Sequence, residues 1–205
     1  KVLSHSHNIR KGLAESLALL GSHSDALTSC SQTKIKNTVT LAIREILLDA
    51  DWVLWASLND LLPLLAEADS REFLDIVENT LSCDPCPFDI LYAQESAGSG
   101  GSTYISGLLW ALEMLAWDPD NFTRVIVLLG ELAARDPGGS WSNRPANSLS
   151  TILLPWLPQT YAELSKRKGA VELLIQEQPI VAWNLVLSLL PSYPQTSHGS
   201  YKPVW

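Results

Sequence analysis

The sequence contains few of the residues that most often carry out catalysis or bind metals. Its 205 residues include only three cysteines, four histidines and one methionine. It has neither a Gly-x-x-x-x-Gly-Lys-Ser/Thr phosphate-binding loop nor a Gly-x-Ser-x-Gly nucleophile motif. We therefore expect no catalytic centre and no cofactor or metal. The low, odd number of cysteines also argues against a secreted disulfide scaffold and fits a reducing compartment.

Long apolar runs are also missing. The strongest apolar stretch, Ile105–Trp117, contains Gly107 and Glu113, so it falls short of the roughly 18–20 residues that a membrane span requires. The segment after Lys1 is polar and does not resemble a signal peptide. We expect a cytoplasmic protein without a membrane partner. Because the chain begins at Lys1 and its only methionine is Met114, we also expect it to be a piece of a longer protein.

Positive charge is scarce. The chain has 14 Lys and Arg against 22 Asp and Glu, which gives a formal net charge of −8. Residues 51–140 hold three basic and fifteen acidic groups, whereas the segments on either side each have a net charge of +2. Such an acidic chain lacks the positive field that nucleic-acid binding needs. The acidic segment is most simply a set of solvated helix faces, and the alternative is a surface that meets a basic partner.

Apolar residues recur at helical spacing along most of the chain. In the first helix Ile9, Leu13, Leu17 and Leu20 share one face, which we expect to be the buried one. Trp52 opens a segment that Pro63 kinks or divides. The expected helices cover about residues 8–21, 33–49, 52–65, 69–82, 103–117, 118–135, 145–154, 160–176 and 178–190.

Two helix starts have clear capping signals. Asp69 lies three residues before Glu72, which is the spacing of a capping box with Asp as the cap. Asp118 precedes Pro119, and this pair places a capping side chain before a proline in the first turn. The helices on either side of Asp118 should form a hairpin with almost no linker. Thr103 or Ser102 is the expected cap of the helix before it, after a glycine-rich connection over 95–103.

The fold class follows from these elements. No alternating four- to eight-residue run bounded by a hairpin turn competes with the helical pattern. We expect an all-α fold, either an array of α-helical hairpins of the α-solenoid type (TPR- or HEAT-like) or an irregular helical bundle. Residues 1–190 should form a single helical domain. Residues 191–205, rich in Pro, Ser, His and Gly, should form an irregular tail.

Cys83 and Cys86 form the only motif-like cluster. Cysteines at this spacing can hold zinc or exchange thiols. Zinc needs about four ligands, however, and the third cysteine and the histidines are distant in sequence. Cys83 follows a predicted helix C-terminus, where the helix dipole disfavours a thiolate. We interpret the pair as part of a structural turn and keep a small metal- or thiol-dependent module as the alternative.

The tryptophans divide into two groups. Five lie in predicted helices and are expected to pack in the core or between helices: Trp52, Trp55, Trp110, Trp117 and Trp183. The other candidates lie in polar or Pro-rich connections and include Trp141, Asn143, Arg144 and Trp156. Because Trp and Arg dominate binding hot spots, these four are the candidate binding residues. The alternative for Trp141 is a side chain that pins its loop onto a helix groove.

Several segments resemble a family of large bacterial proteins. They include Leu108–Glu113 with Leu115–Trp117, Asp136–Gly139, Asn143–Pro145, Leu154–Thr160, and Lys202–Trp205. Together with residues around Trp183, they are similar to a stretch in the helical C-terminal part of these proteins, many of which look like STAND-type antiviral NTPases. The resemblance covers about residues 52–205.

The resemblance implies a role as a sensor. In such proteins a separate ATPase module and an N-terminal effector carry out the chemistry, while the helical C-terminal array senses a trigger, often a phage protein, and supports oligomer formation. The nucleotide-binding motif is absent here, so ATPase activity does not carry over. We expect a non-enzymatic protein-interaction domain that binds a protein partner or other domains of its parent chain. A purely structural spacer is the alternative.

Overall fold

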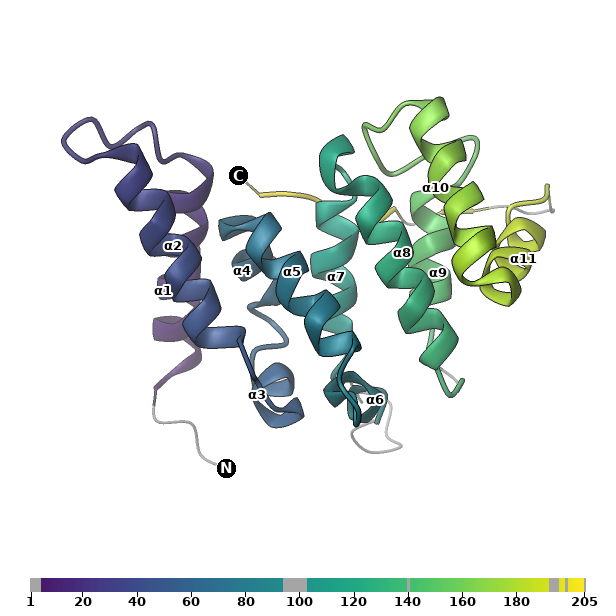
Figure 1. Cartoon of the computed structure of the whole chain (residues 1–205), viewed down its shortest axis with the longest axis horizontal. Helices are drawn as coiled ribbons and strands as arrows, with labels where there is room; N and C mark the ends of the chain where they lie inside the picture. The colour runs from purple at the N-terminus through teal and green to yellow at the C-terminus, as the bar shows by residue number, and fades with distance from the viewer. Residues whose placement is uncertain (1–4, 94–102, 140, 192–195, 198, 205) are drawn as a thin grey trace.

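The computed structural model describes residues 5–93, 103–139, 141–191, 196–197 and 199–204. These residues form eleven helices and no strand, which confirms the all-α prediction (Figure 1). The helices are α1 (His7–Ser22), α2 (Gln32–Leu47), α3 (Trp52–Ser57), α4 (Leu62–Ala68), α5 (Ser70–Leu81), α6 (Pro87–Leu91), α7 (Ser106–Leu115), α8 (Pro119–Arg135), α9 (Pro145–Ile152), α10 (Leu164–Glu177) and α11 (Pro179–Ser188).

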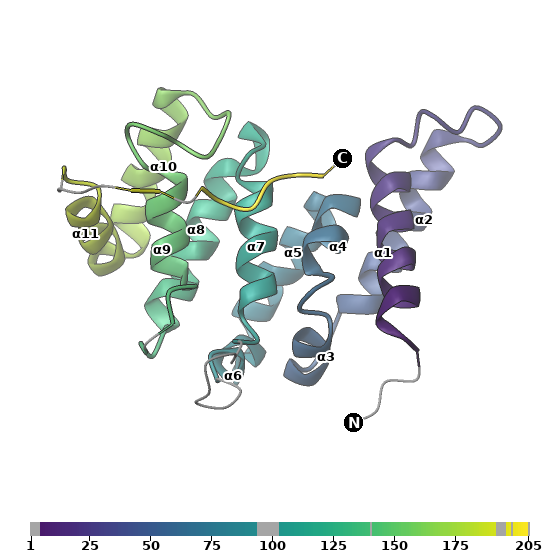
Figure 2. The ribbon, with the colours of Figure 1, turned by 180° about the vertical axis from the view of Figure 1, so that it is seen from behind.

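The longer helices form two layers of an array of helical hairpins. In one layer α1 packs on α4, α4 on α7, α7 on α9 and α9 on α11. In the other, α2 packs on α5, α5 on α8 and α8 on α10. Each hairpin contributes one helix to each layer, and Figures 1 and 2 show the two layers from opposite sides. We call the α1–α4–α7–α9–α11 side the first layer.

The predicted caps of α5 and α8 are confirmed, but the second half of the capping box at α5 is not, because the Glu72 carboxylate accepts hydrogen bonds from Arg44 instead. The Asp69 carboxylate accepts a hydrogen bond from the amide of Glu72 at 3.1 Å, and Asp118 accepts one from the amide of Asp120 at 2.9 Å. Helix α8 begins at Pro119, as expected. Its inner face is fully buried and consists of Phe122, Val125, Ile126, Leu129 and Leu132. The predicted cap of α7 is wrong, because the Thr103 hydroxyl bonds to the Ser106 hydroxyl at 2.8 Å rather than to a backbone amide. Most of the connection over 95–103 lies outside the described residues.

The predicted buried face of α1 is confirmed for Leu17 and Leu20, which are partly buried against the core, and is wrong for Ile9 and Leu13. Ile9 and Leu13 are 56% and 64% exposed, whereas Ala14 and Ala18 are buried. A Cβ placed on Gly21 would lie 1.9 Å from the carbonyl oxygen of Ala68 in α4. Small side chains thus bring the backbones of α1 and α4 close together, and Ile9 and Leu13 remain exposed.

The short helices α3 and α6 pack on each other along one edge of the array (Figure 1). Trp55 of α3 is fully buried and meets the rings of Phe73 and Phe88 edge-on. Pro63 lies in the first turn of α4, so it divides the segment that begins at Trp52 instead of kinking one helix. The core therefore continues from the long helices into the connections between them.

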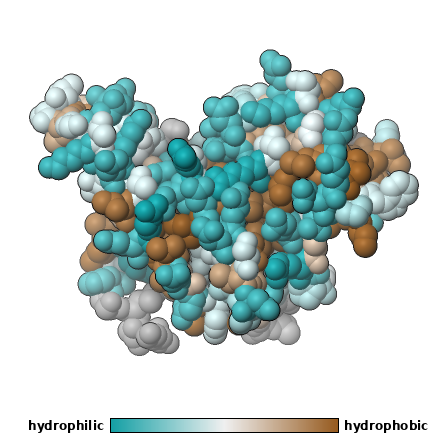
Figure 3. Space-filling view, viewed as in Figure 1, coloured by the Kyte–Doolittle hydropathy of each residue, from teal (hydrophilic) through white to brown (hydrophobic). Residues whose placement is uncertain are grey.

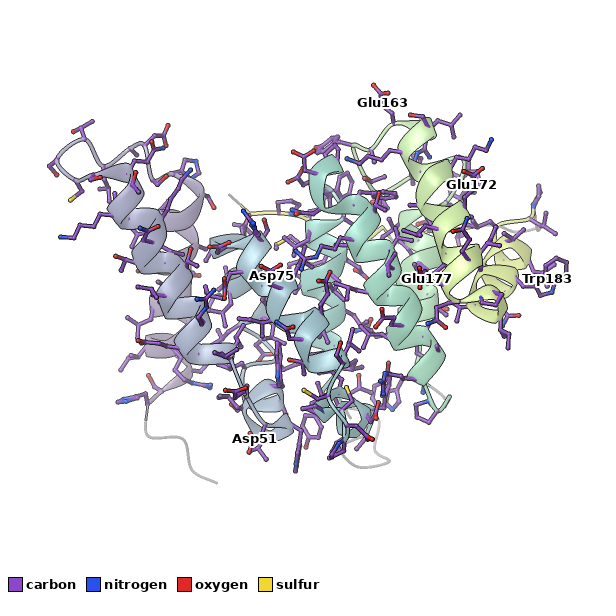
Figure 4. All side chains as sticks on the ribbon, viewed as in Figure 1. Asp51, Asp75, Glu163, Glu172, Glu177 and Trp183 are labelled. Carbon is purple, nitrogen blue, oxygen red and sulfur yellow. The ribbon has the colours of Figure 1, made fainter. Side chains whose placement is uncertain are left out.

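Part of the apolar surface remains uncovered at the α11 end. Ile180 and Trp183 are 77% and 64% exposed, and Figure 4 shows Trp183 projecting from α11. The prediction that Trp183 packs in the core is therefore wrong, and Trp52, at 39% exposure, is only partly covered. Figure 3 shows brown, apolar surface near α10 and α11. Within the described part of the chain, no helix combines the length and hydropathy that crossing a membrane demands.

Candidate functional site

The C-terminal residues 199–204 lie as an extended segment across the first layer. Figure 2 shows this segment crossing α7 at a steep angle and running toward α4. None of its residues belongs to the hydrophobic core. The segment is therefore attached to the surface of the array, and we call it the C-terminal strap.

Helix α7 supplies the centre of the strap site. Trp110, Glu113 and Trp117 are spaced by three and four residues, which places them on one side of the helix and its end. Glu113 is only 9% exposed. One carboxylate oxygen accepts a hydrogen bond from the Ser148 hydroxyl at 2.6 Å, and the other accepts one from the Tyr201 amide at 2.9 Å. A buried carboxylate thus has donors on both oxygens, and one donor belongs to the strap.

The connection between α9 and α10 forms the second side of the site. It is held on the end of α7, because the Thr160 hydroxyl donates to the carbonyl of Ala116 at 2.7 Å and the Tyr161 amide donates to the carbonyl of Trp117 at 3.2 Å. This places the Gln159 side-chain oxygen 3.4 Å from the Ser200 amide, which donates to it. The connection therefore extends the surface that receives the strap.

The Trp117 indole binds the strap through its N–H group and its ring. Its Nε1 donates to the Tyr201 carbonyl at 2.9 Å and to the Ser200 hydroxyl at 3.2 Å. The Lys202 ammonium lies 5.1 Å from the centre of the Trp117 ring, within the range of a cation–π contact. The Tyr161 ring meets Trp117 edge-on at 5.3 Å.

Two further contacts lie on either side of this centre. The Tyr201 ring stacks on Trp110, with centroids 5.9 Å apart and planes 18° apart. At the far end of the strap, the Val204 amide donates to a carboxylate oxygen of Glu67 in α4 at 2.9 Å. The strap site is therefore formed by α4, by α7 with the turn that follows it, and by the α9–α10 connection.

The contacts of the strap and the cost of ordering it are of similar size. Hydrogen bonds to charged acceptors contribute about 1.5–3 kcal/mol and neutral ones about 1 kcal/mol, and the ring contacts add roughly 1 kcal/mol each. Together these contacts amount to on the order of 10 kcal/mol. Fixing six residues costs about 1–2 kcal/mol each. The two totals are of similar size, so the strap adds little net stability to the array.

Three of the four binding residues predicted from sequence lie elsewhere. Trp141, Asn143 and Arg144 are half-buried in the turn that follows α8. Arg144 forms an ion pair with Asp136, and its Nε donates to the carbonyl of Trp141 at 3.1 Å. The turn is thus fastened to itself, at the opposite end of α8 from Trp117, about 25 Å away for a helix of this length.

Trp156 is the predicted binding residue that lies nearest to the strap site in the fold. It is 51% exposed and lies in the same connection as Gln159 and Tyr161. Among the described residues, the Trp156 ring makes no ring contact with the strap. The binding role of Trp156, like that of the turn after α8, stays a prediction.

The two cysteines of the Cys83–Cys86 turn have different environments. Cys83 is exposed, whereas Cys86 is buried and caps α6. Burial raises the pKa of the Cys86 thiol, which disfavours the thiolate that metal binding and thiol exchange both require. The described residues contain no group of three or more His, Cys, Asp or Glu side chains arranged to hold a metal ion.

The residues that form the strap site had only a weak signal in the sequence. Trp110 and Trp117 are seven residues apart, so they share a face of α7, and that spacing could have marked an aromatic face. No sequence pattern links this aromatic face to Tyr201, which lies more than eighty residues further along the chain. No family model matches this sequence, and comparisons with curated proteins and with solved structures gave no significant match.

Proposed function

We propose that this chain is a non-enzymatic protein-interaction domain whose first layer binds an extended segment of a protein partner. The observation that supports this proposal is the strap site itself. There the side chains of Glu67, Glu113 and Gln159 accept hydrogen bonds from backbone amides of an extended segment. Side chains aimed at main-chain groups can hold any extended segment that follows the same path.

The exchangeability of the strap supports the same proposal. Its residues lie outside the core, and its contacts nearly balance the cost of ordering it. A partner segment that supplies equivalent main-chain groups could therefore replace it without unfolding the helices.

The wider setting of this function rests on the resemblance to STAND-type proteins. We propose that the domain works in the bacterial cytoplasm as the sensor of a large anti-phage defence protein. Its partner is a phage protein or another domain of the parent chain, and oligomers form through the rest of the parent. In this setting, binding on the first layer signals to modules that carry the chemistry.

A direct test supplies the strap as a separate molecule. The chain is shortened to end at Ser197, and a fluorescein-labelled peptide with the sequence of residues 197–205 is titrated into it. We expect weak binding that saturates only at millimolar protein, because a separate peptide also loses translational and rotational freedom. Fluorescence anisotropy measures it, with a reversed-sequence peptide of the same composition as the control. Circular dichroism shows whether the shortened chain keeps its helices. If it does and binds neither peptide, the proposal is wrong.

A further inference from the structure

We infer that the first layer selects extended segments in which an aromatic residue is followed directly by a cationic one, and that Tyr201 and Lys202 occupy this site in competition with a partner. The inference rests on the proposed function. It adds the chemistry of the partner segment, which main-chain contacts alone do not specify. Only two strap side chains have ring contacts with the array, and they are adjacent in sequence.

The direction of the strap explains why two adjacent side chains are read. Successive side chains of an extended segment point to opposite sides. Because the strap crosses α7 at a steep angle (Figure 2), its two sides face the two ends of that helix. Tyr201 accordingly meets Trp110, and Lys202 meets Trp117, seven residues further along. Seven residues span about 10 Å of helix.

Glu113 fixes the register of this pair. It lies between the two tryptophans in sequence and accepts the amide of Tyr201 at 2.9 Å, while Trp117 donates to the carbonyl of the same residue at 2.9 Å. The aromatic residue is thus held by both of its main-chain groups. A shift by one residue would exchange the two sides of the strap, so the aromatic and cationic side chains would face the wrong partners.

The charge around the site favours a cation at the second position. The face of an indole ring attracts a cation and repels an anion. Two strap contacts are made by carboxylates, Glu113 and Glu67. An acidic residue in place of Lys202 would be repelled by the indole face of Trp117 and by these two carboxylates.

The two positions after the cationic residue make fewer contacts with the array, so they restrict the partner sequence less. Within the described residues, no hydrogen bond is made by the amide of Lys202, and Pro203 has no amide hydrogen. The following contact to the array is the amide of Val204. A proline directly after the cationic residue is therefore tolerated. The partner segment has the pattern aromatic, cationic, any residue including proline, then a residue with a free amide.

The test uses the full-length chain and four labelled peptides based on Gly-Ser-Tyr-Lys-Pro-Val. One has this sequence, and the others replace Lys by Gln, Lys by Glu, or Tyr by Ser. The chain is compared with its Tyr201→Ser/Lys202→Gln variant, in which the strap loses its ring contacts. We expect the parent peptide to bind the variant at least about 5-fold more tightly than the original chain. Replacement of Lys by Gln should weaken binding about 3-fold, and Lys to Glu should weaken it further.

A third chain identifies the residue that reads the cation. In Trp117→Leu on the background of the strap variant, the parent and Lys-to-Gln peptides should bind equally. If all four peptides bind the strap variant equally, the inference is overturned while the proposed function stands. If the folded strap variant binds none of them at millimolar concentration, both are overturned. Equal binding of the parent peptide to the original and variant chains would refute the competition by the strap.

Discussion

At the scale of single residues, glycines show how closely the backbones of this array approach one another. Gly107 is in the first turn of α7, and its amide donates to the side chain of Asn59 at 2.7 Å. A Cβ added there would lie 1.8 Å from the backbone oxygen of Asn59. Gly12 of α1 has nothing within 4 Å of the same position. Two helical glycines therefore differ only in what surrounds them.

Alanine substitutions at these two glycines should have effects of opposite sign. Gly107→Ala forces the start of α7 away from Asn59 and should lower the free energy of unfolding by about 2–3 kcal/mol. Gly12→Ala removes the entropic cost of a helical glycine and should raise it by about 0.5–1 kcal/mol. Urea denaturation followed by circular dichroism measures both. A neutral Gly107→Ala would contradict the close approach.

The cysteines allow a second prediction at this scale. Because Cys86 is buried and its thiol pKa is raised by burial, it should remain unmodified while Cys30 and Cys83 react with iodoacetamide at pH 8. Mass spectrometry after digestion locates the modified residues. Unfolding in guanidinium before labelling serves as the control and should expose all three thiols. Rapid native alkylation of Cys86 would favour the thiol-dependent alternative.

At the scale of helices, Arg124 joins α8 to α5. Its guanidinium forms ion pairs with Asp75 and Glu78, and Figure 4 shows Asp75 on the α5 ribbon. The Arg124 side chain is only 28% exposed, and its Nη2 lies 2.7 Å from the second oxygen of Glu78. A forked contact of this kind depends on the planar guanidinium.

Lysine should therefore replace Arg124 poorly. Arg124→Lys keeps the charge but loses the two-pronged contact, so we expect a loss of about 1–2 kcal/mol in the free energy of unfolding. Lys168→Ala is the matched control, because it removes an exposed ion pair with Glu172 within one helix. That change should cost less than about 0.5 kcal/mol. Similar losses in the two variants would show that the α5–α8 clamp contributes no more than a surface pair.

The helices also show where sequence patterns are sufficient and where they fail. The bounds and buried face of α8 are predictable because its cap, its first-turn proline and its apolar stripe agree. The buried face of α1 is predictable only in part. Leu17 and Leu20 pack against the core as expected, but Ala14, Ala18 and Gly21 let α1 approach α4 closely while Ile9 and Leu13 stay exposed. Hydrophobicity alone ranks isoleucine and leucine above alanine, and it therefore places Ile9 and Leu13 in the buried stripe and leaves Ala14 and Ala18 out of it.

At the scale of the whole molecule, the array determines how stability is distributed. Each hairpin contacts its neighbours in the two layers, so the central helices have partners on both sides and α1, α2 and α11 do not. Long-range contacts such as the strap on α7 are also a property of this scale. No local pattern reveals them, which is why the strap site could not be predicted from the sequence although its helices could.

This distribution should be visible in hydrogen exchange. We expect the amides of α5, α7 and α8 to exchange most slowly, and those of α1, α2 and α11 to exchange faster, because terminal units open without disturbing the rest. Native-state exchange with mass spectrometry resolves these segments. Uniform protection from α1 to α11 would indicate a single cooperative unit instead.

The attachment of the strap has a mechanical consequence. Between Ser200 and Val204 it spans roughly 14 Å in extended form, and it is fastened at Gln159, Glu113 and Glu67, on successive parts of the first layer. An extended backbone cannot lengthen further, so the first layer cannot spread apart while all three attachments persist. Release of the strap removes this limit, and the curvature of the first layer can then change between α4 and the α9–α10 connection.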